Sequence, residues 1–325
     1  MIDYSLFYRQ RFDSPSDPGL AHNWDTFVSA FNRDERVTRV FEEVTAREKI
    51  WVLHREYDFA DADLPTNAPA YSSSAVQEGD FVREFLDRHL PDPANTRLCV
   101  DITGFMRPHL MVLIRFLAER GVRRFEALYS EPVQYIDGAT TEFALGDVDT
   151  VRQVDGFQGL HELDPSGNEL LVIGAGYESH LIAYVAQSKA TIRHKVQLLG
   201  FPPLQADFYQ ENILQVARSA EAVGGTGEDN PFFAPANDPF VTAEVLRRIV
   251  EKFRRTRGKE LGVRNVYLSP LSTRPQALGF ALYYVHECIN KPVSIIYPFS
   301  MRYNRETSTG LAHTWHYTVE LPARA

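Results

Sequence analysis

Two segments of this sequence place polar and charged side chains at the spacing that ligand-binding loops use. The first, DITGFMR, runs from Asp101 to Arg107 and follows an apolar run that predicts a strand. Thr103 offers a hydroxyl, Gly104 allows a ligand close to the backbone, and Arg107 offers a guanidinium fork that matches a phosphate. Asp101 is a candidate base or ribose acceptor, although an aspartate at this place also bonds neighbouring loop amides.

The second segment, SPLSTRPQ, also follows a predicted strand and carries more polar groups. Its candidate ligand-binding residues are Ser269, Ser272, Thr273, Arg274 and Gln276. Hydroxyls, a guanidinium and an amide in one loop exceed what a helix cap requires, so we expect ligand contact. In both segments an Arg-Pro pair opens a predicted helix, where the missing N–H of proline costs nothing.

A third segment, GAGYES at residues 174–179, superficially matches a dinucleotide-binding turn between a strand and a helix. Ser179 replaces the third glycine, and the next predicted strand ends in glycine rather than in an acid for a ribose, which weakens an NAD assignment. A tight strand-to-helix turn is the alternative. Because backbone amides at a helix start attract anions, Gly176 and Glu178 remain candidate ligand-binding residues.

Signatures of other chemistry are weak. His313 and His316 lie three residues apart in a predicted strand and point to opposite faces, so no metal site is expected. Cys99 and Cys288 fall in separate apolar segments, which predicts buried thiols without a disulfide. The basic run at residues 252–259 is typical of a solvated helix end, with a nucleic-acid or partner patch as the alternative. We expect no cofactor and assign no catalytic residue.

The elements that must position these loops alternate between apolar runs and helical patterns, which predicts parallel sheets covered by helices. Strands are predicted at residues 25–31, 50–54, 98–102, 125–129, 170–173, 196–199, 265–268 and 293–297, with an edge strand at 314–321. Helices are predicted at residues 33–45, 80–90, 108–120, 178–188, 208–222, 241–257 and 275–289. Residues 136–167 are expected to form a hairpin and connector, and residues 64–75 a loop.

The two halves of the chain repeat one order of elements, and their third strands both lead into an Arg-Pro helix start. This pattern predicts an α/β fold with two Rossmann-like parallel-sheet halves, residues 1–150 and 165–325, related by an internal duplication. The alternative is that any two α/β units look alike. We further expect the carboxyl ends of both sets of strands to meet at one shared cleft.

Length and charge set the broad class. At roughly 150 residues per domain, 325 residues predict two domains. The net charge of −9, from 34 Lys and Arg against 43 Asp and Glu, makes duplex nucleic acid an improbable partner. No stretch reaches the roughly 20 apolar residues that span a bilayer, and the amino terminus lacks the apolar core of a signal peptide. We therefore expect a cytoplasmic protein without a membrane partner.

The acid–hydroxyl–glycine loop DITGF resembles the ligand-binding loop of CARF domains, which are Rossmann-like sensors of cyclic oligonucleotides. Two such units in one chain resemble the SAVED arrangement, in which two CARF-like units read cyclic nucleotides in antiviral defence. The resemblance implies a nucleotide-type ligand. Because the sequence carries no evident nuclease, protease or membrane effector segment, the resemblance also implies either a sensor alone or a chain that acts on an effector protein as partner.

Residues and resemblance together predict a protein that binds a nucleotide or cyclic-nucleotide signal. Arg107 and Arg274 are expected to face solvent and hold phosphates. Hydrogen bonds to sugar or base are expected from Thr103, Ser272, Thr273 and Gln276. Two alternatives stay open: a hydrolase-type enzyme that processes nucleotides, with Asp101 or Glu178 as base or nucleophile, and a scaffold whose cleft is vestigial.

Overall fold

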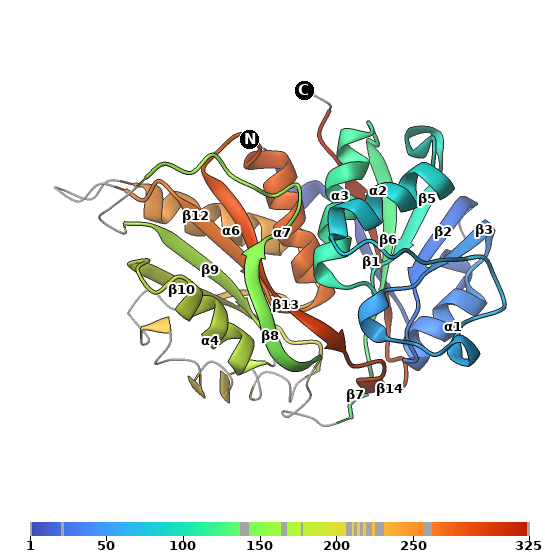
Figure 1. Cartoon of the computed structure of the whole chain (residues 1–325). Helices are drawn as coiled ribbons and strands as arrows, with labels where there is room; N and C mark the ends of the chain where they lie inside the picture. The colour runs from blue at the N-terminus through green and yellow to red at the C-terminus, as the bar shows by residue number, and fades with distance from the viewer. Residues whose placement is uncertain are drawn as a thin grey trace. The chain divides into compact units, whose positions relative to one another are not determined.

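The chain divides into two compact α/β units, each with its own sheet (Figure 1). The computed structural model describes residues 2–20, 23–136, 143–163, 168–176, 178–205, 210, 213–214, 217–218, 223–224, 231–255 and 262–323. The first unit comprises Leu6–Gly146 and Met301–Ala325, and the second comprises Met1–Ser5 and Asp147–Ser300. This division differs from the predicted ranges, because residues from Met301 onward belong with the first unit.

The first unit contains a seven-stranded sheet in the order β1-β15-β6-β5-β2-β3-β4. The strands are β1 (Arg9–Phe12), β15 (Thr314–Glu320), β6 (Arg124–Ser130), β5 (Leu98–Asp101), β2 (Trp24–Ala30), β3 (Ala46–Val52) and β4 (Ala70–Tyr71). The strands from β6 to β4 run parallel, and β15 is antiparallel to both of its neighbours. The predicted edge position of 314–321 is therefore wrong, because the unpredicted strand β1 covers the outer side of β15.

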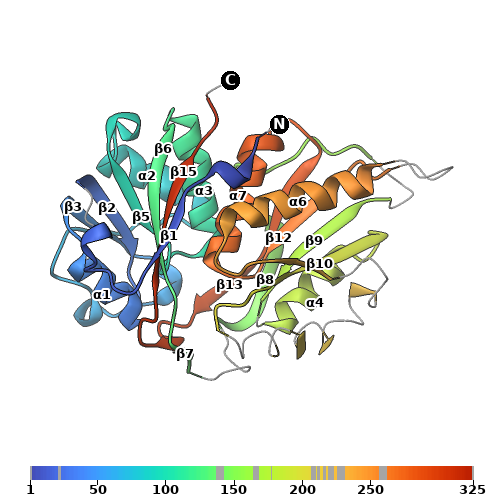
Figure 2. The ribbon, with the colours of Figure 1, turned by 180° about the vertical axis from the view of Figure 1, so that it is seen from behind.

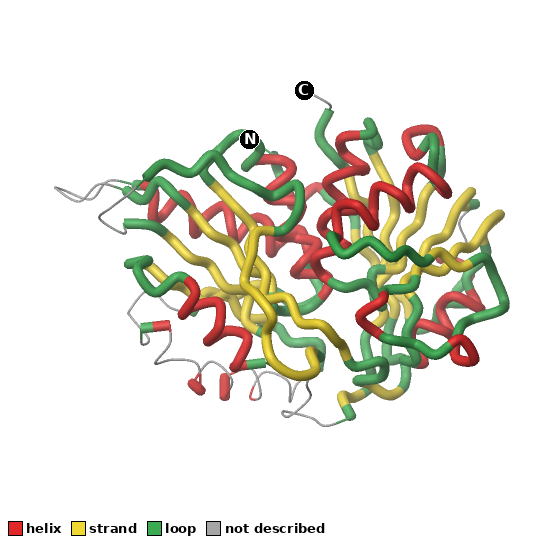
Figure 3. The backbone as a smooth tube through the Cα atoms, viewed as in Figure 1, coloured by secondary structure: helices red, strands yellow, loops and turns green. Residues whose placement is uncertain are grey.

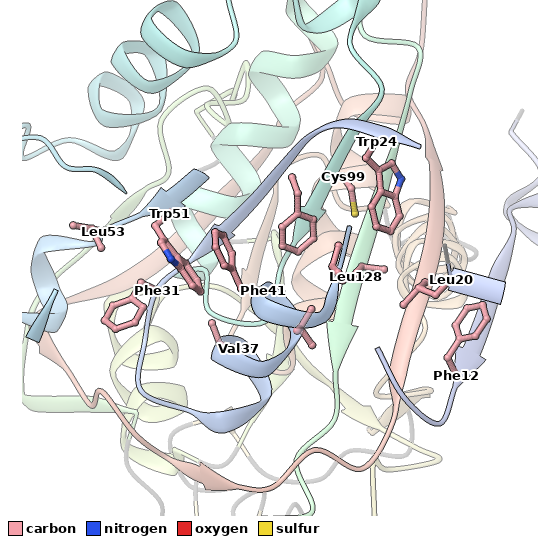
Figure 4. Close-up of a cluster of buried hydrophobic side chains, with 13 residues drawn as sticks. Phe12, Leu20, Trp24, Phe31, Val37, Phe41, Trp51, Leu53, Cys99 and Leu128 are labelled. Atoms are coloured by element: carbon pink, nitrogen blue, oxygen red, sulfur yellow. The ribbon is translucent and has the colours of Figure 1, made fainter. Parts of the chain in front are cut away.

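Three helices cover this sheet: α1 (Glu35–Glu43), α2 (Glu78–His89) and α3 (Arg107–Glu119). Between α1 and the sheet lies a core of aromatic and aliphatic side chains (Figure 4). Phe41 of α1 stacks on Trp51 of β3 with ring centres 3.5 Å apart. Short 3-10 helices lie in the connections at Pro18–Leu20, Arg55–Tyr57, Asp61–Asp63 and Pro93–Asn95.

The second unit contains a six-stranded sheet in the order β11-β10-β9-β12-β13-β8. The strands are β11 (Phe232–Ala234), β10 (His194–Gly200), β9 (Leu170–Ala175), β12 (Val266–Pro270), β13 (Val293–Tyr303) and β8 (Ala144–Gln153). The strands from β11 to β13 run parallel. Strand β8 lies within residues 136–167, which were predicted to form a hairpin and connector. One more 3-10 helix, Tyr4–Leu6, lies where the two units divide.

Helix α4 (Ser179–Ser188) covers one face of this second sheet, and α6 (Pro239–Arg254) and α7 (Arg274–Glu287) cover the other (Figures 1 and 2). Strand β9, LLVIGA, is buried along its whole length, as a parallel strand between two helical layers must be. The side chain of Asp238 caps α6 by accepting hydrogen bonds from the N–H groups of Phe240 and Val241 at 3.0 Å. The predicted helix 208–222 lies mostly outside the described residues.

The parallel strands of the two sheets, which are drawn in yellow in Figure 3, follow the same order along the chain and across the sheet. From β4 to β6, the strands of the first sheet come third, second, first, fourth and fifth along the chain, and the strands from β11 to β13 repeat this order. Beyond these five strands, the first sheet adds β15 and β1 and the second sheet adds β8, and the strands β8 and β15 are exchanged between the two sheets. Strand β8 follows the first sheet in sequence and joins the second, whereas β15 follows the second sheet and joins the first.

Two short strands precede the exchanged strands in the sequence. Strand β7 (Gln134–Tyr135) precedes β8, β14 (Ser308–Thr309) precedes β15, and β7 and β14 pair antiparallel in a two-stranded sheet.

Both cysteines are buried and free, which confirms the predicted buried thiols. None of the described helices is long and apolar enough to cross a bilayer. The predicted α/β class with parallel sheets is confirmed.

Candidate functional site

In each unit the crossovers diverge at one pair of neighbouring strands. In the first sheet the chain moves from β2 to β3 on one side and from β5 to β6 on the other, so the topological switch lies between β2 and β5. In the second sheet it lies between β9 and β12. Open α/β sheets bind ligands outside the carboxyl ends of the strands at this point. The three polar segments of the sequence follow β5, β12 and β9, so all three lie at a switch point.

In the first unit, Asp101 and Thr103 bond to each other and to the sheet. The Asp101 carboxylate accepts hydrogen bonds from the Thr103 N–H at 3.0 Å and from the Thr103 hydroxyl at 2.6 Å. It also accepts one from the Ser29 hydroxyl at 2.8 Å, and the Thr103 oxygen accepts one from the N–H of Ser130 at 3.0 Å. Both side chains are fully buried. These hydrogen bonds hold the loop onto β2 and β6, and the contacts of Asp101 and Thr103 with a ligand stay predictions.

The environment of Asp101 disfavours its charge. Burial raises the pKa of the Asp101 carboxyl from 3.8 to about 6, while the hydrogen bonds from Thr103 and Ser29 and the charge of Arg36 oppose the rise. Because the folded chain holds this proton more tightly than the unfolded chain, the group contributes stability below about pH 4 that is lost as pH rises through about 6.

We expect the unfolding free energy of the first unit to gain about 1 kcal/mol from this group between about pH 7 and about pH 5, at about 1.36 kcal/mol per pKa unit. Urea unfolding followed by tryptophan fluorescence measures it, because Trp24, Trp51 and Trp315 all lie in the first unit. The advantage of wild type over Asp101→Asn should grow by that amount on acidification. A difference that stays constant with pH would contradict the assignment.

Gly104 allows the loop after β5 to pack closely against the end of β2. A Cβ on this residue would lie 1.9 Å from the carbonyl oxygen of Ala30, at the end of β2. The carbonyl of Gly104 itself accepts a hydrogen bond from the hydroxyl of Tyr57 at 3.1 Å. The close neighbour of Gly104 on this side is therefore the protein's own backbone, and the approach of a ligand to Gly104 stays a prediction.

Arg107 is the first residue of α3 and is only 6% exposed. The expectation that it faces solvent is therefore wrong. Its guanidinium carbon lies 5.8 Å from the centre of the Phe143 ring, within the range of a cation–π contact. The positive charge is nevertheless placed at the amino end of a helix, where the dipole also favours an anion.

In the second unit the hydroxyl groups of the SPLSTRPQ loop are buried or form hydrogen bonds within the protein. Thr273 caps α7 by accepting a hydrogen bond from the N–H of Gln276 at 3.3 Å and donates its own proton to the carbonyl of Ala236. The predicted contact of Thr273 with a ligand stays a prediction. Ser269 is fully buried, and its oxygen makes no hydrogen bond among the described residues. Ser272 is also buried, 2.9 Å from the position that a Cβ on Gly174 would occupy.

Gln276 and Arg274 lie in the first turn of α7. The Gln276 side chain is fully buried and donates from Nε2 to the carbonyl of Ala234 at 3.2 Å. Its Oε1 has no hydrogen-bond partner among the described residues and lies 3.7 Å from where a Cβ on Gly200 would be. Arg274, the first residue of the helix, is partly exposed. This arginine keeps the solvent access that Arg107 lacks.

The GAGYES loop abuts the SPLSTRPQ loop across the second switch point. A Cβ on Gly176 would lie 2.2 Å from the carbonyl oxygen of Leu271. The same close approach occurs in both units, but Gly104 follows the later strand of its pair and Gly176 the earlier one. Glu178 occupies the N-cap position of α4 and is buried, so neither residue presents an exposed group to a ligand.

One cluster of side chains with metal-binding atoms, at the carboxyl edge of the first sheet, was not predicted from the sequence. Donor atoms of His54, Glu56 and His109 all lie within 4.8 Å of one another. The two histidines are 55 positions apart and form no spacing motif, although His54 ends one predicted strand and His109 follows another, a signal that could have paired them. His313 and His316 contact different acids, Asp13 and Glu126.

A cavity of about 560 Å³ lies at the other edge of the first sheet. Trp24, Leu98 and Phe125, at the amino ends of β2, β5 and β6, line it together with Arg97 and Arg124. Ligands of open α/β sheets bind at the opposite, carboxyl edge. We therefore do not assign the candidate site to this cavity.

Comparison with known proteins adds no assignment. No protein-family model matches the chain, and no curated protein or solved structure matches it.

Proposed function

We propose that this chain binds a nucleotide-type signal at the carboxyl edges of its parallel sheets. The observation that carries the proposal is the placement of the two Arg-Pro helix starts. Arg107 begins α3 directly after β5, and Arg274 begins α7 directly after β12. β5 and β12 hold corresponding places in their sheets, each beside the switch point.

This placement suits an anion. The amino end of a helix presents free N–H groups and a partial positive charge, and a guanidinium on its first residue adds a full charge with a bidentate fork. In the second unit, Gln276 Oε1 is a buried acceptor that has no partner among the described residues. A buried acceptor normally has a partner, and a hydroxyl or amino group of a ligand would supply one.

We further propose that the two units arose by internal duplication. The matched strand orders and the paired Arg-Pro starts support this history. The resemblance to CARF and SAVED units supports a cyclic nucleotide as the signal and an effector protein as the partner. The shared cleft stays a prediction.

The proposal is tested first by mass spectrometry of small molecules released from the purified chain. A panel of cyclic di-, tri- and tetranucleotides is then titrated by calorimetry. Loss of a charge-assisted bidentate contact of about 1.5–3 kcal/mol weakens binding roughly 10- to 150-fold. We expect this loss in Arg274→Ala, with partial recovery in Arg274→Lys because ammonium lacks the fork.

The chain offers matched controls at the amino ends of the same strands. Arg264 precedes β12 and pairs with Glu162 at 2.7 Å, and Arg97 precedes β5 and pairs with Asp25 at 2.8 Å. Alanine at either control position should leave affinity unchanged. Arg107→Ala is expected to lower both affinity and stability, because the side chain is buried. Equal affinity of wild type and Arg274→Ala for every ligand found would contradict the phosphate contact.

The enzyme alternative predicts turnover of the bound nucleotide. Its proposed base Asp101 is fully buried and accepts three hydrogen bonds from the loop and β2. Such a carboxylate does not meet a substrate, so binding without turnover is the function we favour. Incubation with a nucleotide pool and chromatography of the products distinguishes the two.

A further inference from the structure

Three side chains with metal-binding atoms converge at the carboxyl edge of the first sheet. His54 lies just past the end of β3, Glu56 lies in the 3-10 helix Arg55–Tyr57, and His109 lies in the first turn of α3. The two imidazole rings are 4.5 Å apart, centre to centre, and the donor atoms of all three residues lie within 4.8 Å of one another. These residues come from three separate elements, so the fold itself brings them together.

The donor set is that of a zinc site. Two imidazoles and one carboxylate are a recurrent set of three protein ligands, with the fourth tetrahedral position left to water or substrate. With metal–ligand bonds of about 2.0–2.2 Å, tetrahedral ligand atoms lie about 3.4 Å apart. The present spacing therefore needs side-chain shifts on the order of 1 Å. We propose that His54, Glu56 and His109 bind a zinc-class divalent metal ion.

The state of Glu56 is the second observation that points to a cation. Its Oε2 is shielded from solvent and accepts no hydrogen bond among the described residues, although the residue as a whole is partly exposed. A buried carboxylate oxygen without a donor is costly, and a bound cation would remove that cost. The exposed part of Glu56 gives the ion a route from solvent.

Aromatic rings pack against both histidines of the cluster. The His54 ring lies 5.5 Å from that of Phe105, and the His109 ring lies 5.1 Å from that of Phe81, both edge to face. Apolar neighbours lower the local dielectric constant and so strengthen the attraction between a cation and the Glu56 carboxylate. Both histidines are at most 5% exposed, so packing limits the orientations that their rings can adopt before metal binds.

Metal binding competes with a hydrogen bond within the site. Nε2 of His54 accepts a long hydrogen bond of 3.4 Å from the N–H of Met106. Coordination through Nε2 would take up that lone pair, and coordination through Nδ1 would leave the proton on Nε2, so either mode ends this bond. At 3.4 Å the bond is weak and its loss is small beside a metal–imidazole bond. Met106 is the N-cap of α3, so the ion would lie beside the Arg107 helix start.

The inference does not depend on the proposed nucleotide ligand, and its test uses the metal alone. The full chain without an affinity tag is stripped with a chelator and titrated with Zn²⁺, with bound metal measured by mass spectrometry and coordination by the visible absorption of Co²⁺. We expect one metal ion per chain and a four-coordinate cobalt spectrum. Mg²⁺ should not compete, because it prefers oxygen ligands.

The matched control is His89→Gln, because His89 also packs against aromatic rings, Tyr71 at 5.5 Å and Phe85 at 5.6 Å, but lies outside the cluster. Glu56→Gln and His109→Gln should weaken Zn²⁺ binding on the order of 100-fold, and His89→Gln should not. If His109→Gln does not fold, the Glu56→Gln variant decides the test, because Glu56 is partly exposed and its replacement disturbs the core less. Absence of stoichiometric Zn²⁺ in wild type, or equal binding by Glu56→Gln, would overturn the proposal.

Discussion

Replacement of Arg36 by alanine is expected to lower the unfolding free energy of the first unit by about 3–5 kcal/mol, the range for breaking a buried ion pair. The Arg36 guanidinium is 2% exposed and lies 3.3 Å from the carboxylate of Asp34, which is equally buried. It also donates a hydrogen bond to the carbonyl of Ser130 at 2.9 Å. Its removal leaves a buried carboxylate without its cation.

The same carboxylate explains why the loss should spread beyond α1. Asp34 accepts hydrogen bonds from the N–H groups of Thr307 at 3.0 Å and Ser308 at 3.2 Å, which anchors β14. Urea unfolding followed by tryptophan fluorescence measures the effect. Arg39→Ala is the control on the same helix: Arg39 is 43% exposed and pairs with Glu43, so about 0.5 kcal/mol is expected. Similar losses in both variants would show that burial of the Arg36 pair is unimportant.

Gly104→Ala is expected to cost about 3 kcal/mol, the upper end for overpacking. The new methyl group would lie 1.9 Å from the Ala30 carbonyl oxygen, and a backbone atom cannot rotate away as a flexible side chain can. The loop after β5 would have to move off β2, which stretches the hydrogen bonds around Asp101. The readout is again tryptophan fluorescence in urea.

Gly121→Ala provides the comparison for Gly104. Gly121 has φ of +82°, and a Cβ there would meet nothing within 4 Å. Only the strain of a positive φ remains, roughly 1 kcal/mol. If Gly104→Ala were no worse than Gly121→Ala, the close approach of the two switch-point strands would not limit stability.

The sequence predicted the α/β class and most parallel strands because their signals are local. A run such as LLVIGA at β9 is apolar throughout, and helices α3 and α7 begin at the Arg-Pro pairs that mark them. The partner of each strand is not local information. The position of β15 between β1 and β6 depends on the short polar strand Arg9–Phe12, which has no apolar alternation to reveal it.

The sequence predicted where the polar loops lie in the fold, but it did not predict which groups their side chains contact. Polar residues after β5 and β12 do gather at the switch points, as parallel topology requires. Sequence cannot tell whether a loop hydroxyl faces a ligand or the protein, and Thr103 and Thr273 both turned out to bond the chain itself. The histidine cluster was missed because His54 and His109 meet only through the fold.

The exchange of β15 also affects when the first unit can fold during synthesis. The sheet of the first unit places β15 between β6 and β1, so its inner hydrogen bonds are complete only when residue 320 has left the ribosome. Until then β6 presents an open edge on the nascent chain, and β1 has no strand to pair with. An amino-terminal unit built in this way finishes folding last, or together with the whole chain, rather than ahead of the second unit.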